Sequence, residues 1–481
     1  MKRVHSLHAF GAFMTVGVVT LTIFSHFIDP TAKRDEVIAL LSLLLLLSGA
    51  YGFAAYGLTQ GRGTGRLRAV VVWAVIFRIA LLPSKPILET DYYRYLWDGF
   101  VLAHGINPYR YTPLEILSPK NDSVLDASDR EDRERLRSLL RTHLQAREVL
   151  ENVNHPEIKT VYPPGAQILF GISAVFFPLS LWGWRLVILL FDAALMQCLI
   201  LLLSRWGRDP TCVLFYAWSP LVLKEYINTL HFDGIALSLF FLGILLTVSN
   251  VRKRAAPALA GAIQIKLFPL LLLPAWSRRL TLRGGLWIGV WVMLFLLPFL
   301  SVGKAGLSGL ALFSYQWESN SSLTALFEWF YQTLGFPPWG EGPVWFSLAG
   351  VPVTGDAFLW AKLSAVGLFL LIFIYLSFFK SAGENRTEEQ SLYLSFLVLG
   401  ALLICGPIGN PWYIAWITPF LCFFPRLSWI YLCVSCFVYY TFFLSDPWGY
   451  PAWSRPLEYL PFYGLLLWEW RRPSPDASQK P

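Results

Sequence analysis

Long apolar runs alternate with shorter polar segments along this chain of 481 residues. Most runs have about 17 to 24 residues, enough for a helix to cross ~30 Å of hydrocarbon. A spanning helix satisfies all its backbone hydrogen bonds internally, so the pattern predicts a bundle of membrane helices. The apolar runs lie at 8–27, 38–58, 67–83, 166–182, 185–204, 211–228, 233–249, 256–276, 284–302, 356–379, 391–406, 411–425, 428–445 and 457–470.

Composition supports the same fold class. Hydrophobic residues make up 55% of the chain, charged residues 15%, and the mean hydropathy is +0.50, which excludes an ordinary soluble protein of this length. We therefore predict an all-α polytopic membrane protein with about 12–14 apolar helices. The net charge of +8 comes mainly from short basic clusters between apolar runs. Membrane topology and contact with membrane lipids explain such clusters, and no nucleic-acid partner is expected.

Two long polar intervals, 84–165 and 303–355, interrupt the apolar pattern. The positive-inside rule places Lys2, Arg3 and the arginines of 62–68 in the cytoplasm, so both intervals are predicted to be extracytoplasmic loops. The remaining basic clusters also favour the cytoplasm, and they can all lie there only if two of the apolar runs do not cross the membrane. The best candidates for this are 166–182 and the interrupted run 256–276. This interpretation gives twelve crossings, with 224–233 facing outward; the alternative is fourteen full crossings.

The same pattern divides the chain into five parts. They are the N-terminal transmembrane helices (1–83), the first large extracytoplasmic loop (84–165), a central membrane module with broken or re-entrant segments (166–302), the second extracytoplasmic loop (303–355) and the C-terminal transmembrane helices with a short cytoplasmic tail (356–481). Within the first loop, 119–154 carries leucines at helical spacing among charges, which predicts an amphipathic helix at the surface.

A polar motif, "ETDYYRYLWDGF" at 89–100, follows closely on the apolar run that ends at Pro83. In a helix, Asp91, Tyr95 and Asp98 recur at i, i+4 and i+7 and share one face at the membrane boundary. Carboxylates placed there can meet a substrate from water or from lipid. The alternative is structural, with Asp91 capping the helix beside Thr90 and Asp98 paired with Arg94.

Two further motifs place polar groups inside apolar runs. "KEYINTLHFDG" carries Lys224, Glu225, Asn228, His231 and Asp233 between two apolar helices, where charges are costly unless they are paired or line water. "AIQIKLFPLLLLP" contains the single cation Lys266, which could either snorkel to the interface or bind an anion such as a phosphate.

An aromatic motif, "GPIGNPWYIAWITP" at 406–419, follows a break made by Gly, Pro and Asn. Its Trp412, Tyr413 and Trp416 could form an interfacial belt or hold a sugar ring or isoprenoid chain. The chain has no phosphate-binding P-loop, GxSxG or HExxH motif, which disfavours a nucleotide-driven cytoplasmic enzyme.

Taken in order, "DYYRYLWDG", "GINPY", "TVYPPGAQ", "EYINTLHFDG", "IKLFPLLLLP" and "NPWYIAWITP" resemble the GT-C superfamily of membrane glycosyltransferases. The nearest branch resembles the bacterial mannosyltransferases that use polyprenyl-phosphate mannose. The resemblance implies a bacterial plasma-membrane enzyme whose active site faces the extracytoplasmic side. It also implies transfer of a hexose, with mannose as the expected sugar, from a polyprenyl-phosphate donor to a lipid or glycan acceptor.

The resemblance implies an essential acidic residue in the first loop, which maps onto Asp91, with Asp98 as the second candidate. We expect Asp91 to act as the base of one inverting displacement. Because Tyr92 follows Asp91, the family's adjacent acidic pair is absent, and a divalent metal stays an open alternative. The expected substrate-binding residues are Arg94, Tyr95, Tyr162, Glu225, Asn228, His231, Asp233, Lys266, Asn410, Trp412 and Tyr413. The competing functions are a transporter or flippase of lipid-linked sugar and a lipid-linked glycan polymerase or ligase.

Overall fold

The computed structural model describes residues 2–28, 33–59, 66–118, 127–380, 386–445 and 447–472. Helices dominate it, and the described strands are the two of one antiparallel hairpin, β1 (Val344–Leu348) and β2 (Val351–Thr354). The first half of the chain forms α1 (Lys2–Phe24), α2 (Arg34–Thr59), α3 (Arg66–Leu81), α4 (Asp91–Ala103), α5 (Pro113–Leu117), α6 (Ala127–Thr142), α7 (Leu144–Glu151), α8 (Pro164–Phe176), α9 (Leu181–Arg205), α10 (Leu214–Ala217), α11 (Pro220–Val222) and α12 (Asp233–Val248).

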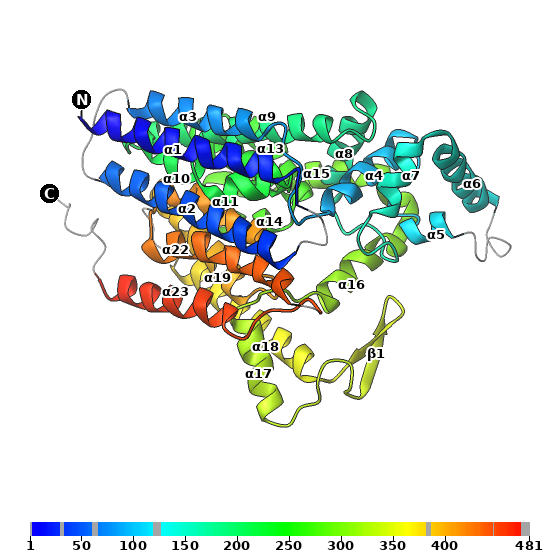
Figure 1. The fold of residues 1–481 in the computed structure, drawn as a ribbon. Coiled ribbons are helices and arrows are strands. Elements are labelled where there is room, and N and C mark those ends of the chain that lie inside the picture. Colours follow the sequence, from blue (N-terminus) through cyan, green and yellow to red (C-terminus); the bar gives the residue numbers. More distant parts are fainter. Residues whose placement is uncertain are drawn as a thin grey trace.

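The second half continues the helical architecture. It forms α13 (Arg252–Ile265), α14 (Phe268–Leu272), α15 (Ser277–Leu296), α16 (Ser308–Gln316), α17 (Leu323–Thr333), α18 (Ala357–Ile374), α19 (Glu388–Cys405), α20 (Pro411–Ile414), α21 (Thr418–Leu421), α22 (Leu427–Ser435) and α23 (Ser454–Arg471). Figure 1 shows α1, α2, α3, α9 and α23 running in roughly the same direction across the bundle, with the start of α1 and the end of α23 at one end of it. The helices of the first polar interval, α4 to α7, lie at the other end.

Seven helical segments of the described chain are long and apolar enough to cross a membrane, and a bent pair makes a possible eighth. The seven are Ser6–Phe24, Arg34–Gly57, Leu181–Arg205, Phe268–Val302, Ala357–Phe379, Glu388–Cys405 and Leu427–Leu444. This confirms the predicted all-α polytopic membrane class. The other predicted crossings are shorter or interrupted helices or, as in α23 with its 18 residues, helices that are not apolar enough. The number of twelve to fourteen crossings therefore stays a prediction.

The two segments expected not to cross are indeed short or broken. Helix α8 has 13 residues and is therefore about 20 Å long, less than the hydrocarbon thickness. In the second, α13 ends at Ile265, Lys266 is extended, and α14 begins at Phe268. The chain also bends by 111° between Pro220–Asn228 and Asp233–Val248, which brings the polar motif of 224–234 into the protein interior.

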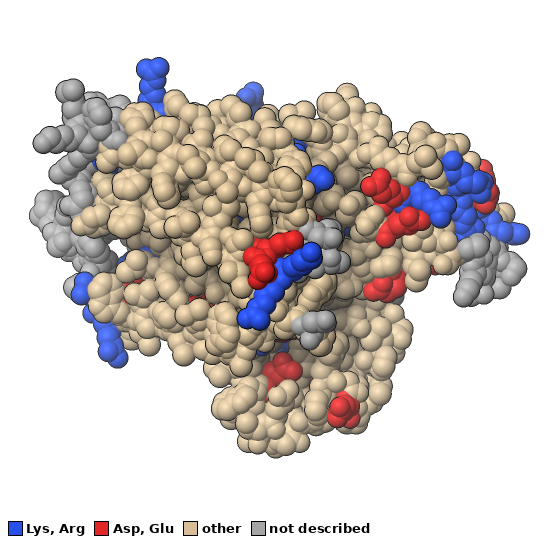
Figure 2. Space-filling view, viewed as in Figure 1, with Lys and Arg blue, Asp and Glu red and all other residues tan. Residues whose placement is uncertain are grey.

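The predicted amphipathic helix of 119–154 is two helices, because the chain leaves helical geometry at His143 between α6 and α7. Residues 119–126 lie outside the described part. Leu136 and Leu140 of α6 are buried, as their spacing predicted, while its charged face is exposed. Figure 2 shows this charge gathered at the α6 end, with a broad uncharged surface over the bundle.

Buried polar contacts fix the segment that leads from α3 to α4. Arg185 donates hydrogen bonds to the carbonyls of Leu82 and Ser84, each at 2.7 Å. Asn228 accepts from the Ile87 N–H at 3.2 Å and donates to the Lys85 carbonyl at 2.8 Å. These side chains satisfy backbone groups that a buried loop would otherwise leave unpaired, and they hold the start of α4 in place.

Candidate active site

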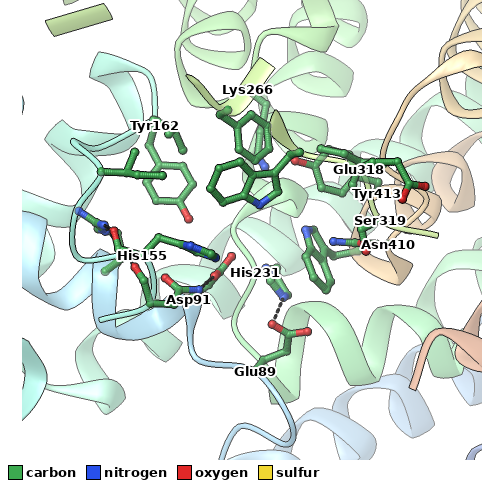
Figure 3. A pocket seen from close by; sticks show the side chains of 18 of the residues that line it. Glu89, Asp91, His155, Tyr162, His231, Lys266, Glu318, Ser319, Asn410 and Tyr413 are labelled. Carbon is green, nitrogen blue, oxygen red and sulfur yellow. Dashed lines mark hydrogen bonds and ion pairs between the residues drawn. The ribbon is translucent and has the colours of Figure 1, made fainter. Parts of the chain in front are cut away.

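A cavity of about 530 Å³ lies where α4, the α12–α14 region and the loops after α16 and α19 meet. Figure 3 shows Asp91, His155 and Tyr162 on one side and Glu318, Ser319 and Asn410 on the other. Of the thirteen predicted site residues, nine line this cavity: Asp91, Arg94, Tyr95, Tyr162, His231, Lys266, Asn410, Trp412 and Tyr413. The structure thus brings together side chains that are up to 322 positions apart (413 − 91).

Asp91 is the first residue of α4, where the helix dipole favours a negative charge. Its Oδ1 accepts a hydrogen bond from Nδ2 of Asn154 at 2.6 Å. Among the described residues no donor is hydrogen-bonded to the other carboxylate oxygen, and Asp91 lines the cavity. The N-cap position is Thr90, not Asp91, and it makes no side-chain capping hydrogen bond, contrary to the structural alternative in which Asp91 caps the helix.

Arg94, one turn further along α4, holds the loop that carries Asn154. Its Nη2 donates to the carbonyls of Asn154 at 3.3 Å and of His155 at 2.9 Å. His155 has a φ of 48°, a left-handed conformation that is unusual for a residue with a side chain. Arg94 therefore stabilises the turn that aims the Asn154 amide at Asp91, rather than standing free for a phosphate.

Lys266 is the cation that the break between α13 and α14 presents to the cavity. Its Nζ lies 3.0 Å from Oδ1 of Asp233, and its side chain is 16% exposed, whereas Asp233 is fully buried. Trp416 also donates to Asp233, at 2.8 Å. The ammonium lies 4.9 Å from the ring centroid of Tyr413. Asp233 thus positions the cation from behind and does not itself line the cavity.

Glu89 and His231 form a second polar pair on the floor of the cavity. The His231 Nε2 and Glu89 Oε2 atoms are 3.8 Å apart, and the His231 ring stacks on Trp412 with centroids 4.1 Å apart. Burial raises the pKa of Glu89 well above its ordinary value, and the neighbouring Asp91 and Glu225 raise it further. Glu89 consequently holds its proton to higher pH than an exposed carboxyl group does.

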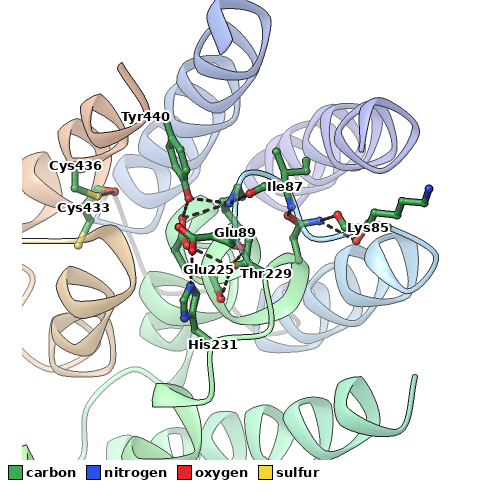
Figure 4. A network of polar contacts seen from close by, with 12 residues as sticks. Lys85, Ile87, Glu89, Glu225, Thr229, His231, Cys433, Cys436 and Tyr440 are labelled. Carbon is green, nitrogen blue, oxygen red and sulfur yellow. Dashed lines mark hydrogen bonds and ion pairs between the residues drawn. The ribbon is translucent and has the colours of Figure 1, made fainter. Parts of the chain in front are cut away.

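Four predicted residues lie away from the cavity: Asp98, Glu225, Asn228 and Asp233. Asp98 is buried and accepts from Gln167 at 3.0 Å, and burial raises its pKa. Glu225 accepts from the Tyr440 hydroxyl at 2.7 Å and lies 3.7 Å from Lys224 in a buried network (Figure 4). Asn228 pins the backbone of 85–87, as described above. These four residues stabilise the segments that form the cavity and do not line it themselves.

Sequence reasoning missed several lining residues. Glu89 is the first residue of the motif at 89–100, but its helical spacing did not group it with Asp91 and Asp98. Asn154 and His155 lie just before the "TVYPPGAQ" motif. The second polar interval, from which no candidate was taken, supplies Trp317, Glu318 and Ser319. These three could have been predicted, because the loop is expected to face the same side of the membrane as Asp91 and carries a carboxylate, a serine and a tryptophan together.

Within the described ranges, no group of three or more His, Cys, Asp and Glu side chains is placed to hold a metal ion. The carboxylates that line the cavity are Glu89, Asp91 and Glu318. Glu318 is engaged by Arg455 at 2.9 Å. The arrangement therefore offers a carboxylate, Asp91, and a cation, Lys266, facing a common space with aromatic walls.

Residues 6–127 match the family model described as alpha-(1->6)-mannopyranosyltransferase, N-terminal domain. The matched region includes α4 and Asp91. This match agrees with the resemblance drawn from the sequence motifs and supports mannosyl transfer as the general reaction. No curated protein and no solved structure gives a significant match to the chain.

Proposed function

We propose that the protein transfers mannose from a polyprenyl-phosphate carrier to a lipid or glycan acceptor on the extracytoplasmic side of the bacterial plasma membrane. The observation that carries the proposal is that Asp91 and Lys266 line one cavity, which aromatic and apolar side chains such as Trp412, Tyr413 and Phe443 also line. The family match to residues 6–127 supports the sugar. A donor that is half lipid and half sugar suits such a cavity, because it needs polar groups at the reacting centre and apolar surface beside it.

The proposed reaction is a single inverting displacement. Asp91 removes the proton from the acceptor hydroxyl through the carboxylate oxygen that Asn154 leaves free. The hydroxyl oxygen attacks the anomeric carbon, the bond from that carbon to the phosphate oxygen breaks, and the polyprenyl phosphate departs with the electron pair. Lys266 stabilises the negative charge that develops on the departing phosphate.

The remaining residues position these two groups. Asn154 orients Asp91, and Arg94 fixes the turn that carries Asn154. Asp233 and Trp416 hold Lys266 at the break between α13 and α14. Trp412 and Tyr413 provide flat apolar faces for the sugar or the first isoprene units. Positioning of this kind accounts for much of a displacement's rate when the leaving group is already good.

The test uses purified full-length protein in lipid nanodiscs with radiolabelled polyprenyl-phosphate mannose and an α-mannoside acceptor. The proposal expects a new glycosidic bond whose anomeric configuration is opposite to that of the donor. A product of retained configuration would contradict the single displacement. Movement of the labelled lipid across the bilayer of sealed proteoliposomes, without any new glycosidic bond, would instead identify a transporter.

A further inference from the structure

The cavity wall opposite Asp91 is built by two segments far apart in sequence. Residues 318–320 follow α16, and residues 406–410 follow α19. The Ser319 N–H donates to the Pro407 carbonyl at 3.0 Å, and the Gly409 N–H donates to the Ser319 carbonyl at 2.7 Å. This parallel pairing presents Glu318, Ser319 and Asn410 together (Figure 3).

Helix α23 braces this wall from behind. Arg455 donates to both carboxylate oxygens of Glu318, at 2.9 and 3.1 Å. Ser321 adds its N–H to the same carboxylate at 3.0 Å. The Tyr459 hydroxyl donates to the carbonyl of Asn320 at 2.8 Å. With so many contacts, the wall is preorganised, and Glu318 still lines the cavity with 19% of its side chain exposed.

Asn410 has a buried polar atom that the protein leaves unused. It stands at the N-cap of α20, where an asparagine ordinarily accepts from the helix N–H groups, yet it makes no capping hydrogen bond. The residue is 8% exposed, and its Oδ1 has no hydrogen-bond partner among the described residues. An unpaired buried amide oxygen costs free energy, so its place on the cavity wall points to a donor supplied by a ligand.

The chemistry of this wall differs from that around Lys266. It combines a carboxylate, a hydroxyl and an amide with the rings of Trp317 and Trp412, which line the same cavity. Sugar hydroxyls donate to carboxylates and amide oxygens, and the apolar face of a sugar ring packs on tryptophan. A phosphate would be repelled by Glu318, so this wall does not suit the charged part of the donor.

We propose that Glu318 and Asn410 form the acceptor subsite and bind the hydroxyl groups of a saccharide ring opposite Asp91 and Lys266. This inference rests on the proposed function only in naming the saccharide as acceptor. The binding of a sugar at this wall can be measured without any donor. The two walls then divide the cavity into a part for the lipid phosphate and a part for the incoming sugar.

The test measures binding of methyl α-D-mannopyranoside to the full-length protein in nanodiscs by tryptophan fluorescence. This probe follows from the name of the matched family model. Glu318→Gln and Asn410→Ala are each expected to weaken binding about tenfold, the effect of one lost hydrogen bond in a desolvated site. Asp98→Asn is the matched control, because Asp98 is buried against Gln167 away from the cavity, and it should bind the probe as the wild type does. Asn410→Ala removes no side-chain hydrogen bond to a described residue, and thermal unfolding of the variant shows whether the lost packing of this side chain affects the fold.

Steady-state kinetics separate this proposal from the proposed function. In the two variants, the KM for the acceptor should rise while the KM for the lipid donor stays unchanged. A rise in the donor KM alone, or probe binding equal to that of the wild type in both variants, would overturn the subsite. If the wild type transfers no sugar but binds the mannoside through Glu318 and Asn410, the saccharide subsite is supported and the transferase proposal fails.

Discussion

Removing the Lys266 ammonium tests how the protein stabilises its leaving group. The side chain of Asp233 is fully buried, and its contacts are the Lys266 Nζ at 3.0 Å and the Trp416 indole N–H at 2.8 Å. In Lys266→Met, the carboxylate loses its cation, and breaking a buried pair in this way costs about 3–5 kcal/mol of stability. A loss of activity in the single variant would therefore mix unfolding with chemistry.

The double variant Lys266→Met/Asp233→Asn removes that complication, because no unpaired buried charge remains and the asparagine can still accept from Trp416. We expect its thermal stability to return toward that of the wild type. Its kcat should stay low by about 10²–10³, the cost of one missing donor to the transition state, about 2.7–4 kcal/mol. The assay is initial-rate sugar transfer in nanodiscs, with Asp233→Asn alone as the control that keeps the cation. A stable double variant with the kcat of the wild type would refute the assignment of Lys266 to the phosphate.

Three further predictions concern Asn154 and Glu89, which lie near Asp91, and Gly409 in the opposite wall. Asn154→Ala should lower kcat by about 10- to 150-fold, because a hydrogen bond to a charged group contributes about 1.5–3 kcal/mol, and an unchanged rate would remove Asn154 from the account. Burial, and then the charges of Asp91 and Glu225, raise the pKa of Glu89 in the folded protein above its ordinary value of 4.5. The wild type therefore loses stability as the pH rises from 4.5 through the raised pKa, because the unfolded chain gives up this proton first. Glu89→Gln should therefore unfold at a higher temperature than the wild type at neutral pH and at the same temperature near ~pH 4, and a constant difference across pH would contradict this sign. In Gly409→Ala, the new Cβ would lie 2.2 Å from the Asn320 carbonyl oxygen, and the strain should cost about 1–3 kcal/mol in unfolding experiments, whereas full stability would show that the wall adjusts freely.

The fold class was predictable because membrane helices are specified by local composition. Runs such as 185–204 and 428–445 become helices that match the hydrocarbon thickness, and hydropathy alone identifies them. Shorter elements were harder, because their geometry depends on tertiary contacts. The break at Lys266 was foreseen from its prolines and polar residues, but the 111° bend before Asp233 depends on packing that the linear pattern does not encode.

The site was predictable in part, for a similar reason. Motif residues such as Asp91 and Lys266 stood out because charge next to an apolar run is costly, and both line the cavity. Whether a charged residue faces a cavity or a buried partner depends on its orientation, so Asp98 and Glu225 could not be separated from Asp91 beforehand. Glu318 could not be placed at all, since only the pairing of Ser319 with the segment after α19 brings it to the cavity.

The most direct test of the central claim compares two aspartates on one helix. Asp91→Asn and Asp98→Asn each remove a carboxylate charge from α4, but Asp91 lines the cavity while Asp98 is buried against Gln167. Mannosyl transfer and carrier binding are measured on both variants. We predict that Asp91→Asn still binds the carrier but that its transfer rate falls by about 10²–10⁴-fold, the usual contribution of a general base. Asp98→Asn should retain transfer close to the wild-type rate. Transfer kept by Asp91→Asn and lost by a folded Asp98→Asn would contradict the account.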